Sequence, residues 1–244
     1  MCRLLGALSS WECGLPYWLV DGKNALREQS RKHPHGWGIA AFSGGAWKLV
    51  REPKPAHQDE RFVREARAAR GWAFVAHVRN ASRGGMTLAN THPFLRHGWA
   101  FAHNGTVVND AELRADIAPD MQPLGETDSE ALFLLILTEL RRASPAYPSV
   151  PSAEVCRCLL DVVPRINANR GTSFLLSDGR RLFFYRERML LKWLRLEDDA
   201  MDGLLIASEP IGDERWTDVP DGEGFVAEAS LHMPAWSELA GASS

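Results

Sequence analysis

The order of strand-like and helix-like patterns limits the folds that are open to this chain. Short apolar runs and period-2 alternation predict strands at 3–8, 37–42, 47–51, 72–78, 99–103, 173–176, 181–186, 190–196 and 204–207. Helical periodicity predicts helices at 60–70, 110–117, 128–142 and 153–169. The strands fall into two groups with a helical pair between them. Because this order is not strict β-α-β alternation, it disfavours a doubly wound parallel sheet and favours an α+β arrangement of sheets covered by helices.

Length and composition favour one domain over the whole of 1–244. The chain has 244 residues, of which 45% are hydrophobic and 24% charged, which is ordinary for a globular protein with a substantial core. The proline-rich stretch 144–151 reads as a connector between two helices rather than a domain linker, because the strand patterns on both sides need partners. The small, polar tail beyond residue 233 is expected to fray.

The charge pattern gives no reason to expect nucleic acid or a membrane as a partner. The formal net charge is -3, and no run of like charges stands out. The longest apolar run, 131–137, is far shorter than the ~20 residues that a membrane span needs. The first ten residues lack the apolar core and the cleavage site of a signal peptide. We therefore expect a soluble, cytoplasmic protein.

The sequence predicts neither a metal site nor a disulfide framework, and we expect no cofactor. A chain of this length does not need disulfide bonds for stability, so the four cysteines are expected to be free thiols. Cys156 and Cys158 lie in a predicted helix, where residues two apart point to different faces. His33 and His35 stand close together, but no third ligand has a suitable spacing.

Cys2 is the first candidate for catalysis. Initiator methionine is normally removed when the second residue is small, and its removal would leave Cys2 as the N-terminal residue. The free α-amine has a pKa of ~7.7–8.0 and can then take the proton of its own thiol. The thiol, with a pKa of ~8.5, is only partly ionised without such help. A cysteine at position two also occurs by chance, so this residue alone does not establish a function.

Asn104-Gly105 permits two interpretations. Asn-Gly between apolar segments is a leading signal for a hairpin turn, and local grounds favour that interpretation. The functional alternative is an oxyanion hole, in which the Asn104 amide and the Gly105 backbone N–H are the two donors. Each fixed donor of this kind contributes roughly 3–4 kcal/mol to a developing oxyanion.

Two further candidates also have structural explanations. Residues 127–130, Thr-Asp-Ser-Glu, form a capping box before an apolar helix, where Asp128 is also favoured by the helix dipole. Arg79 follows a predicted strand, and a single arginine at a strand end usually extends to water. Its planar guanidinium nevertheless matches a carboxylate with two hydrogen bonds.

Taken together, these fragments occur in the order found in class II (purF-type) glutamine amidotransferases, and the chain resembles that family from Cys2 to about residue 220. The motifs are Met1-Cys2, Ala-His-Val-Arg at 76–79 followed by Ala81-Ser82, Thr-His-Pro-Phe at 91–94, Ala-His-Asn-Gly at 102–105, Thr-Asp-Ser-Glu at 127–130 and Ala-Ser-Glu-Pro at 207–210. The resemblance implies a four-layer αββα sandwich of the N-terminal-nucleophile hydrolase type.

The resemblance also assigns catalytic roles. Cys2 would attack the γ-carbonyl of a glutamyl amide, and Asn104 with Gly105 would hold the oxyanion. A thioester would form, release ammonia or an amine, and hydrolyse to glutamate.

The resemblance further implies a set of substrate-binding residues. Arg79 would bind the α-carboxylate of the small-molecule γ-glutamyl substrate, and Asp128 would pair with its α-ammonium. Ser82 and His92 would line the pocket.

One departure and three functions stay open at this point. His35-Gly36-Trp37-Gly38 stands where stand-alone relatives tend to carry Asp-Gly-Trp-Gly, which leaves the role of His35 undetermined. Segments 208–210 and 216–220 are similar to those of the γ-glutamyl hydrolase of ergothioneine biosynthesis, and the amidotransferase-like subunits of glutathione degradation are also similar. The alternatives are a glutaminase subunit that delivers ammonia to a separate synthase chain, and a non-catalytic binding module that retains Met1.

Overall fold

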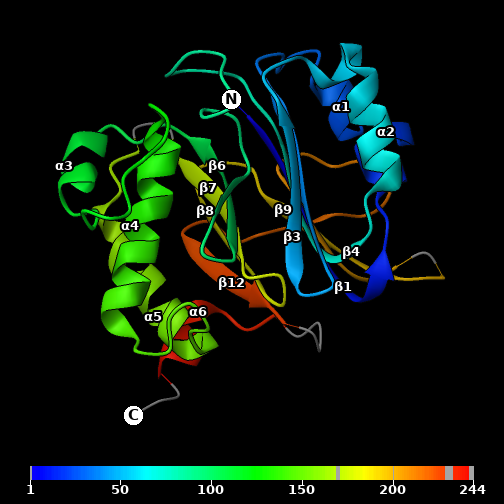
Figure 1. Cartoon of the computed structure of the whole chain (residues 1–244). Coiled ribbons are helices and arrows are strands. Elements are labelled where there is room, and N and C mark those ends of the chain that lie inside the picture. The colour runs from blue at the N-terminus through cyan, green and yellow to red at the C-terminus, as the bar shows by residue number, and fades with distance from the viewer. Residues whose placement is uncertain (1, 169–170, 200, 229–232, 242–244) are drawn as a thin grey trace.

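Two antiparallel sheets lie face to face between two helical layers, so the expected four-layer αββα arrangement is confirmed (Figure 1). The computed structural model describes residues 2–168, 171–199, 201–228 and 233–241. Two helices, α1 (Leu26–Gln29) and α2 (Glu60–Ala68), cover the outer face of one sheet (Figure 1). The outer face of the other sheet is covered by α3 (Asp110–Ala115), α4 (Asp128–Ala143), α5 (Ser152–Val162) and α6 (Trp236–Gly241). Helices and strands thus form separate layers, as in other α+β folds.

Within the described part of the chain, the larger sheet has seven strands in the order β11-β9-β10-β1-β4-β2-β3. All its neighbouring strands are antiparallel, and the first strand of the chain lies at its centre, between β10 and β4. Its strands are β1 (Arg3–Cys13), β2 (Trp37–Ser43), β3 (Ala46–Glu52), β4 (Gly71–Val78), β9 (Lys192–Glu197), β10 (Asp202–Ala207) and β11 (Thr217–Asp218).

The smaller sheet has, among the residues that the structure describes, five antiparallel strands in the order β12-β8-β7-β6-β5. Its strands are β5 (Phe94–Arg96), β6 (Trp99–Gly105), β7 (Thr172–Ser177), β8 (Leu182–Glu187) and β12 (Glu223–Ala227).

The alternation of side chains along β1 explains why the two sheets stack. Leu4 and Leu8 face the second sheet, whereas Leu5 and Ala7 face the helices, as expected for successive residues of a strand. Both faces of this strand are therefore apolar. At Gly6 the sheets approach so closely that a Cβ atom would lie 3.0 Å from Leu175.

Helices α2, α3, α4 and α5 lie at the predicted positions with shifts at their ends, whereas α1 and α6 were not predicted. Single helical turns also lie at Tyr17–Asp21, Ala56–Gln58 and Val163–Arg165. The connector at 144–151 joins α4 to α5 as expected. The helix predicted at 153–169 ends earlier because Pro164 cannot continue it, and its predicted last residue lies outside the described residues.

The expectation that the tail beyond residue 233 frays is wrong for its described part. Residues 236–241 form α6, and Trp236 is 1% exposed. Its indole stacks on Tyr185 at 5.6 Å and on Phe174 at 6.0 Å between ring centroids. Trp236, with Leu239 packed against the same core, thus anchors a segment whose other residues are small or polar.

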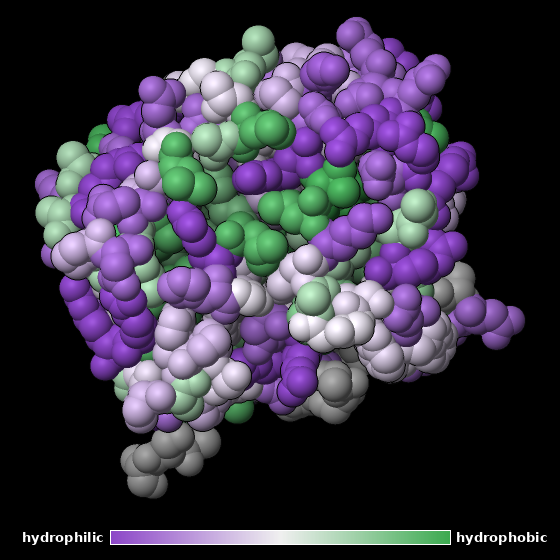
Figure 2. All heavy atoms as spheres, in the orientation of Figure 1, coloured by the Kyte–Doolittle hydropathy of each residue, from purple (hydrophilic) through white to green (hydrophobic). Residues whose placement is uncertain are grey.

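Between α4 and β3 the molecule is hollowed, and apolar side chains gather there within a hydrophilic surround (Figure 2). The residues that line the hollow include Leu49, Phe94, Leu95, Leu124 and Phe133. Within the described ranges, no helix combines the length and the hydropathy needed to cross a bilayer.

Candidate active site

Cys2 lies at the end of the central strand of the larger sheet, where the two sheets leave a cleft. Residue 3 is in register with Val78 of β4, so the thiol lies beside the residues that follow this strand. The backbone N–H of Asn80 donates to Cys2 Sγ at 3.3 Å, and Sγ lies 3.6 Å from the carbonyl oxygen of Asn80. The N-terminus thus begins between the sheets, at one end of the sandwich (Figure 1).

The cleft beside Cys2 has a volume of about 170 Å³ and is formed by segments far apart in the sequence. Its walls come from the start of the chain, the loop after β4, the end of β6 and the residue before β7. The lining residues are Cys2, Asn80, Ala81, Ser82, Gly105, Thr106 and Gly171. This volume is smaller than the ~300 Å³ at which pockets for drug-sized ligands begin, so it suits a small ligand such as a single amino-acid side chain.

The surroundings of Cys2 keep its thiol protonated. Burial raises the pKa of the Cys2 thiol, whereas the Asn80 N–H and the Arg79 guanidinium lower this pKa and the Asp128 carboxylate raises it. Because burial has the largest effect, the sulfur needs a base before it can act as a nucleophile. Arg79 and Asp128 carry opposite charges and both lie close enough to act on the thiol.

Asn104 and Gly105 do not form a hairpin turn, so that interpretation is wrong. Both belong to β6, in register with Ser173 and Thr172 of β7. Gly105 has φ +149°, and a Cβ atom there would lie 2.8 Å from the carbonyl oxygen of Gly171, so the position requires glycine. Asn104 is buried, and its Oδ1 has no partner among the described residues. The strand thus brings its last residue, Gly105, to the cleft wall.

Arg79 is 2% exposed and does not extend to solvent, so the surface interpretation of this residue is also wrong. Its guanidinium donates to the carbonyl oxygens of Gly85 at 3.0 Å, Arg83 at 2.6 Å and Gly84 at 3.2 Å. Burial lowers the pKa of Arg79, and the charges of Cys2 and Asp128 raise it. Arg79 directly precedes Asn80, which lines the cleft, so its guanidinium places a positive charge near the Cys2 thiol.

Asp128 is the first residue of α4 and is 4% exposed. Thr127 caps the helix, because its hydroxyl accepts from the Glu130 N–H at 3.2 Å. The Asp128 carboxylate instead accepts from the Val107 N–H at 2.6 Å. The capping prediction is therefore confirmed for Thr127, and Asp128 connects α4 to the segment after β6.

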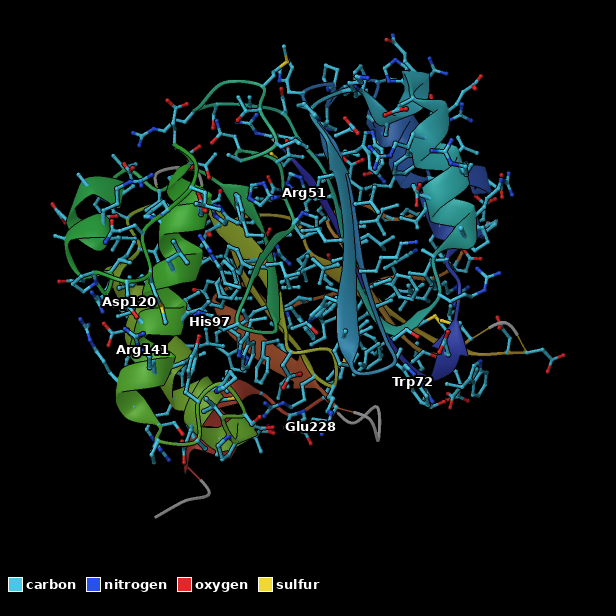
Figure 3. All side chains as sticks on the ribbon, in the orientation of Figure 1. Arg51, Trp72, His97, Asp120, Arg141 and Glu228 are labelled. Atoms are coloured by element: carbon cyan, nitrogen blue, oxygen red, sulfur yellow. The ribbon has the colours of Figure 1, made fainter. Side chains whose placement is uncertain are left out.

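Ser82 lines the cleft, and its hydroxyl lies 3.4 Å from that of Thr106. His92 is not among the lining residues: it is buried and stacks on His77, with 4.2 Å between the ring centroids. The segment that contains His92 is held from β3, because Arg51 donates to the carbonyl oxygens of Thr91 at 2.7 Å and Pro93 at 3.3 Å (Figure 3).

His35 holds the loop that carries Ser82. Its Nδ1 accepts from the Ala81 N–H at 2.9 Å, and its own backbone N–H donates to the Arg79 carbonyl oxygen at 3.0 Å. The Arg79 N–H donates in turn to Gly36 at 2.8 Å. His35 therefore fixes the backbone of residues 79–81, which lie beside Cys2.

Four residues around Cys2 were not among the candidates predicted from the sequence. Asn80, Thr106 and Gly171 line the cleft, and Arg3 donates to the carbonyl oxygen of Cys2 at 3.0 Å. Asn80 directly follows the arginine of the Ala-His-Val-Arg motif, so its position was the one available signal. Among the described residues, no group of three or more histidine, cysteine, aspartate or glutamate side chains is arranged to hold a metal ion.

The sequence profile of the class II glutamine amidotransferases matches residues 1–198. The chain belongs to this family, and the protein is an enzyme with a glutamine amidotransferase or γ-glutamyl hydrolase type of activity.

Among individual relatives, the chain is 31% identical to the γ-glutamyl-hercynylcysteine sulfoxide hydrolase of Mycobacterium tuberculosis, over 91% of this chain and 90% of that protein. It is 32% identical to an uncharacterised protein of Methanocaldococcus jannaschii, over 93% of this chain and 69% of the relative.

Solved structures support the same fold. A predicted glutamine amidotransferase from Pseudomonas aeruginosa superposes with a TM-score of 0.65 at 26% identity, over 95% of this chain and 99% of that chain. Glutamine phosphoribosylpyrophosphate amidotransferase from B. subtilis superposes with a TM-score of 0.70 at 17% identity, over 96% of this chain but 49% of that longer chain. The fold is therefore that of the N-terminal-nucleophile hydrolases.

Proposed function

We propose that the protein hydrolyses a γ-glutamyl amide through a thioester on Cys2, after removal of Met1. The observation that carries the proposal is the position of the Cys2 thiol at a small cleft, with oppositely charged side chains next to it. A γ-glutamyl group ends in an α-carboxylate and an α-ammonium, so it needs one partner of each sign.

The first half of the reaction forms the thioester. The α-amine of Cys2 takes the thiol proton, and the sulfur attacks the γ-carbonyl carbon to form a tetrahedral intermediate. The Asn104 amide and the Gly105 N–H donate to its oxyanion. When the intermediate collapses, the C–N bond breaks, and the leaving amine takes the proton held by the α-amine.

The second half hydrolyses the thioester. The α-amine, neutral again, takes a proton from a water molecule that attacks the same carbonyl carbon. The C–S bond breaks, the thiol regains a proton, and glutamate leaves. No metal or cofactor is required, because the nucleophile, the base and the oxyanion donors belong to the chain.

Substrate binding is assigned to the charged pair beside the cleft. Arg79 has five N–H donors, and its three hydrogen bonds to loop carbonyls leave donors for a carboxylate. Asp128 pairs with the α-ammonium. Ser82 contacts the bound substrate at the cleft wall, and His92 supports the site from beneath rather than lining it.

A specialised γ-glutamyl compound is the proposed substrate. This is supported by the hydrolase of Mycobacterium tuberculosis, which matches this chain over nearly the full length of both proteins. The alternative is a glutaminase subunit that supplies ammonia to a separate synthase chain. The two functions differ in the substrate that the protein prefers.

The test is a panel of γ-glutamyl amines and γ-glutamyl thioether compounds, with glutamine and glutathione included, assayed for release of glutamate. We expect one γ-glutamyl compound to exceed glutamine in kcat/KM. Rapid turnover of free glutamine in the absence of any partner chain would contradict the specialised hydrolase.

The first prediction concerns the nucleophile in that assay. Cys2→Ala should abolish glutamate release, while Cys13→Ala, which changes a buried free thiol elsewhere, should retain it. Intact-mass measurement of the active protein should show the loss of one methionine. Retained activity in Cys2→Ala would falsify the mechanism.

A further inference from the structure

We propose that Arg3 and Glu209 act as a positioning pair for the N-terminal residue. In this proposal Arg3 holds the backbone of Cys2 and favours the neutral form of its α-amine, and Glu209 balances the charge of Arg3. The inference rests on the proposed function, because the α-amine of Cys2 exists only after Met1 has been removed.

The alternation of the strand brings Arg3 into this position. Residue 3 points to the face opposite to Cys2 and Leu4, so it does not enter the cleft. From the other side of the sheet its Nη1 donates to the carbonyl oxygen of Cys2 at 3.0 Å, and its Nη2 forms an ion pair with Glu209. One guanidinium therefore fixes the peptide plane after the nucleophile and is itself anchored by a carboxylate.

The anchor of this pair is rigid. Ser208, which follows β10, donates its N–H to the carbonyl oxygen of Leu4 at 3.1 Å, and its hydroxyl accepts from the Leu4 N–H at 2.9 Å. Asn24 donates to the carbonyl oxygen of Pro210 at 2.8 Å on the other side of Glu209. The side chains of Arg3 and Glu209 are 16% and 31% exposed, so solvent screens their charges less than those of an ordinary surface pair.

The electrostatic consequence follows from the role of the amine. A base must be neutral to accept a proton, and a neighbouring guanidinium disfavours the ammonium form, whereas a carboxylate favours it. The other charged groups around residue 2 are Arg79 after β4 and Asp128 at the start of α4. They remain in place when Arg3 or Glu209 is changed.

His33 also lies near the pair. Burial, together with the charge of Arg3, lowers the pKa of His33 to about 4, while Glu209 opposes this shift. His33 is therefore neutral throughout the range in which the amine titrates. His35 is engaged by the Ala81 N–H through Nδ1.

The experiment compares the pH dependence of kcat/KM for Arg3→Gln, Glu209→Gln and the double variant. The acid limb of this profile is the range in which kcat/KM falls because the α-amine of Cys2 becomes protonated. Arg3→Gln leaves the Glu209 carboxylate unbalanced, so this limb should move to higher pH by about one unit. At pH values below the limb, kcat/KM should then be about tenfold lower than in the wild type. Glu209→Gln should move the limb to lower pH. The double variant should return close to the wild-type limb.

The matched control is Arg195→Gln. Arg195 forms a half-buried ion pair with Asp202 at 2.6 Å, at the opposite end of β10 from Ser208, so its loss should leave the acid limb unchanged. Thermal unfolding of each variant identifies any that fail to fold, and Glu209→Gln still tests the proposal if Arg3→Gln is unstable.

The proposal is overturned if the pH profiles of the single variants coincide with that of the wild type, or if both single variants move the acid limb in the same direction. If these occur while Cys2→Ala is inactive, the proposed function stands and only the role of Arg3 and Glu209 is lost. If Cys2→Ala is active, the proposed function itself fails.

Discussion

Arg79 illustrates at the scale of one residue how backbone carbonyl oxygens can hold a buried charge. Three backbone carbonyl oxygens of the loop at 83–85 surround its guanidinium. Such hydrogen bonds compensate for part of the cost of removing the charge from water. The same bonds fix the guanidinium beside Cys2 before any substrate arrives.

The second prediction concerns this residue. Arg79→Leu should raise KM and lower kcat/KM by about 10- to 100-fold, because a charged hydrogen bond contributes about 1.5–3 kcal/mol. Steady-state kinetics with the preferred γ-glutamyl compound measure KM and kcat/KM of the variant. Arg51→Leu is the control, since Arg51 also donates to backbone carbonyls but lies on β3. Equal losses in both variants would reduce Arg79 to a structural role.

The third prediction concerns His35, the position at which the resemblance to stand-alone relatives implies aspartate. The feature that matters is an acceptor for the Ala81 N–H. His35→Asp supplies such an acceptor and should retain most of kcat/KM, whereas His35→Ala should lose about tenfold, because the loop that carries Ser82 loses one of its supports. If both variants are equally impaired, the imidazole has a role other than accepting this bond.

At the scale of elements, α6 depends on the apolar side chains that it packs on the core. The helix has six residues, and an isolated helix of this length is not stable in water, so it forms because Trp236 is inserted between the smaller sheet and α5, with Leu239 packed against the same core. The stacking of Trp236 on Tyr185 and Phe174 connects the end of the chain to β7 and β8.

The fourth prediction tests that dependence. Trp236→Ala should lower the free energy of unfolding by about 3–5 kcal/mol, which urea titration measures. Trp72→Ala is the matched control, because Trp72 is 43% exposed at the end of the sandwich away from Cys2, and its loss should cost much less (Figure 3). Comparable losses at the two positions would contradict the anchoring role of Trp236.

Most long elements could be predicted from the sequence, because their apolar period is strong. Strands β1, β2, β4 and β6 and helix α4 all lie within a few residues of the predicted ranges, except that β1 runs on to Cys13. Some short elements could not: β5, β11 and α6 depend on tertiary contacts and show no clear apolar period of their own.

The candidate site was predictable for a related reason. Cys2, Ser82 and Gly105 belong to motifs whose order along the chain identifies the family, and the fold brings them to one cleft. Local patterns alone gave the wrong interpretation of Asn104-Gly105 and of Arg79, because a turn signal and a strand-end arginine carry no information about burial. Asn80 was missed because it contacts Cys2 through backbone atoms, and Arg3 because its partner Glu209 lies 206 residues away in the sequence.

At the scale of the whole molecule, buried histidines make stability depend on pH. Burial lowers the pKa of His77 to about 3 and that of His103 to about 4, and it holds the pKa of His92 well below its usual range. In the unfolded chain a histidine has a pKa of ~6.5. Between these values the unfolded state binds more protons than the folded state, so protonation favours unfolding.

The fifth prediction follows from that sign. The free energy of unfolding should be constant above about pH 7 and fall steadily as the pH drops below about 6.5 toward 4, by several kcal/mol in total. Urea unfolding at a series of pH values measures the slope. His77→Phe, which removes one titrating group from a buried site, should reduce the slope. A flat dependence between pH 7 and 5 would show that the three imidazoles are protonated in the folded state.

The central position of β1 has a practical consequence for anyone producing this enzyme. The strand that begins just after Cys2 is enclosed by β10 and β4, and the cleft opens directly at residue 2, while α6 lies at the far end of the sandwich (Figure 1). On the proposed mechanism, an affinity handle fused ahead of Cys2 would occupy the cleft and block the α-amine. Purification handles and fusion partners therefore belong after α6.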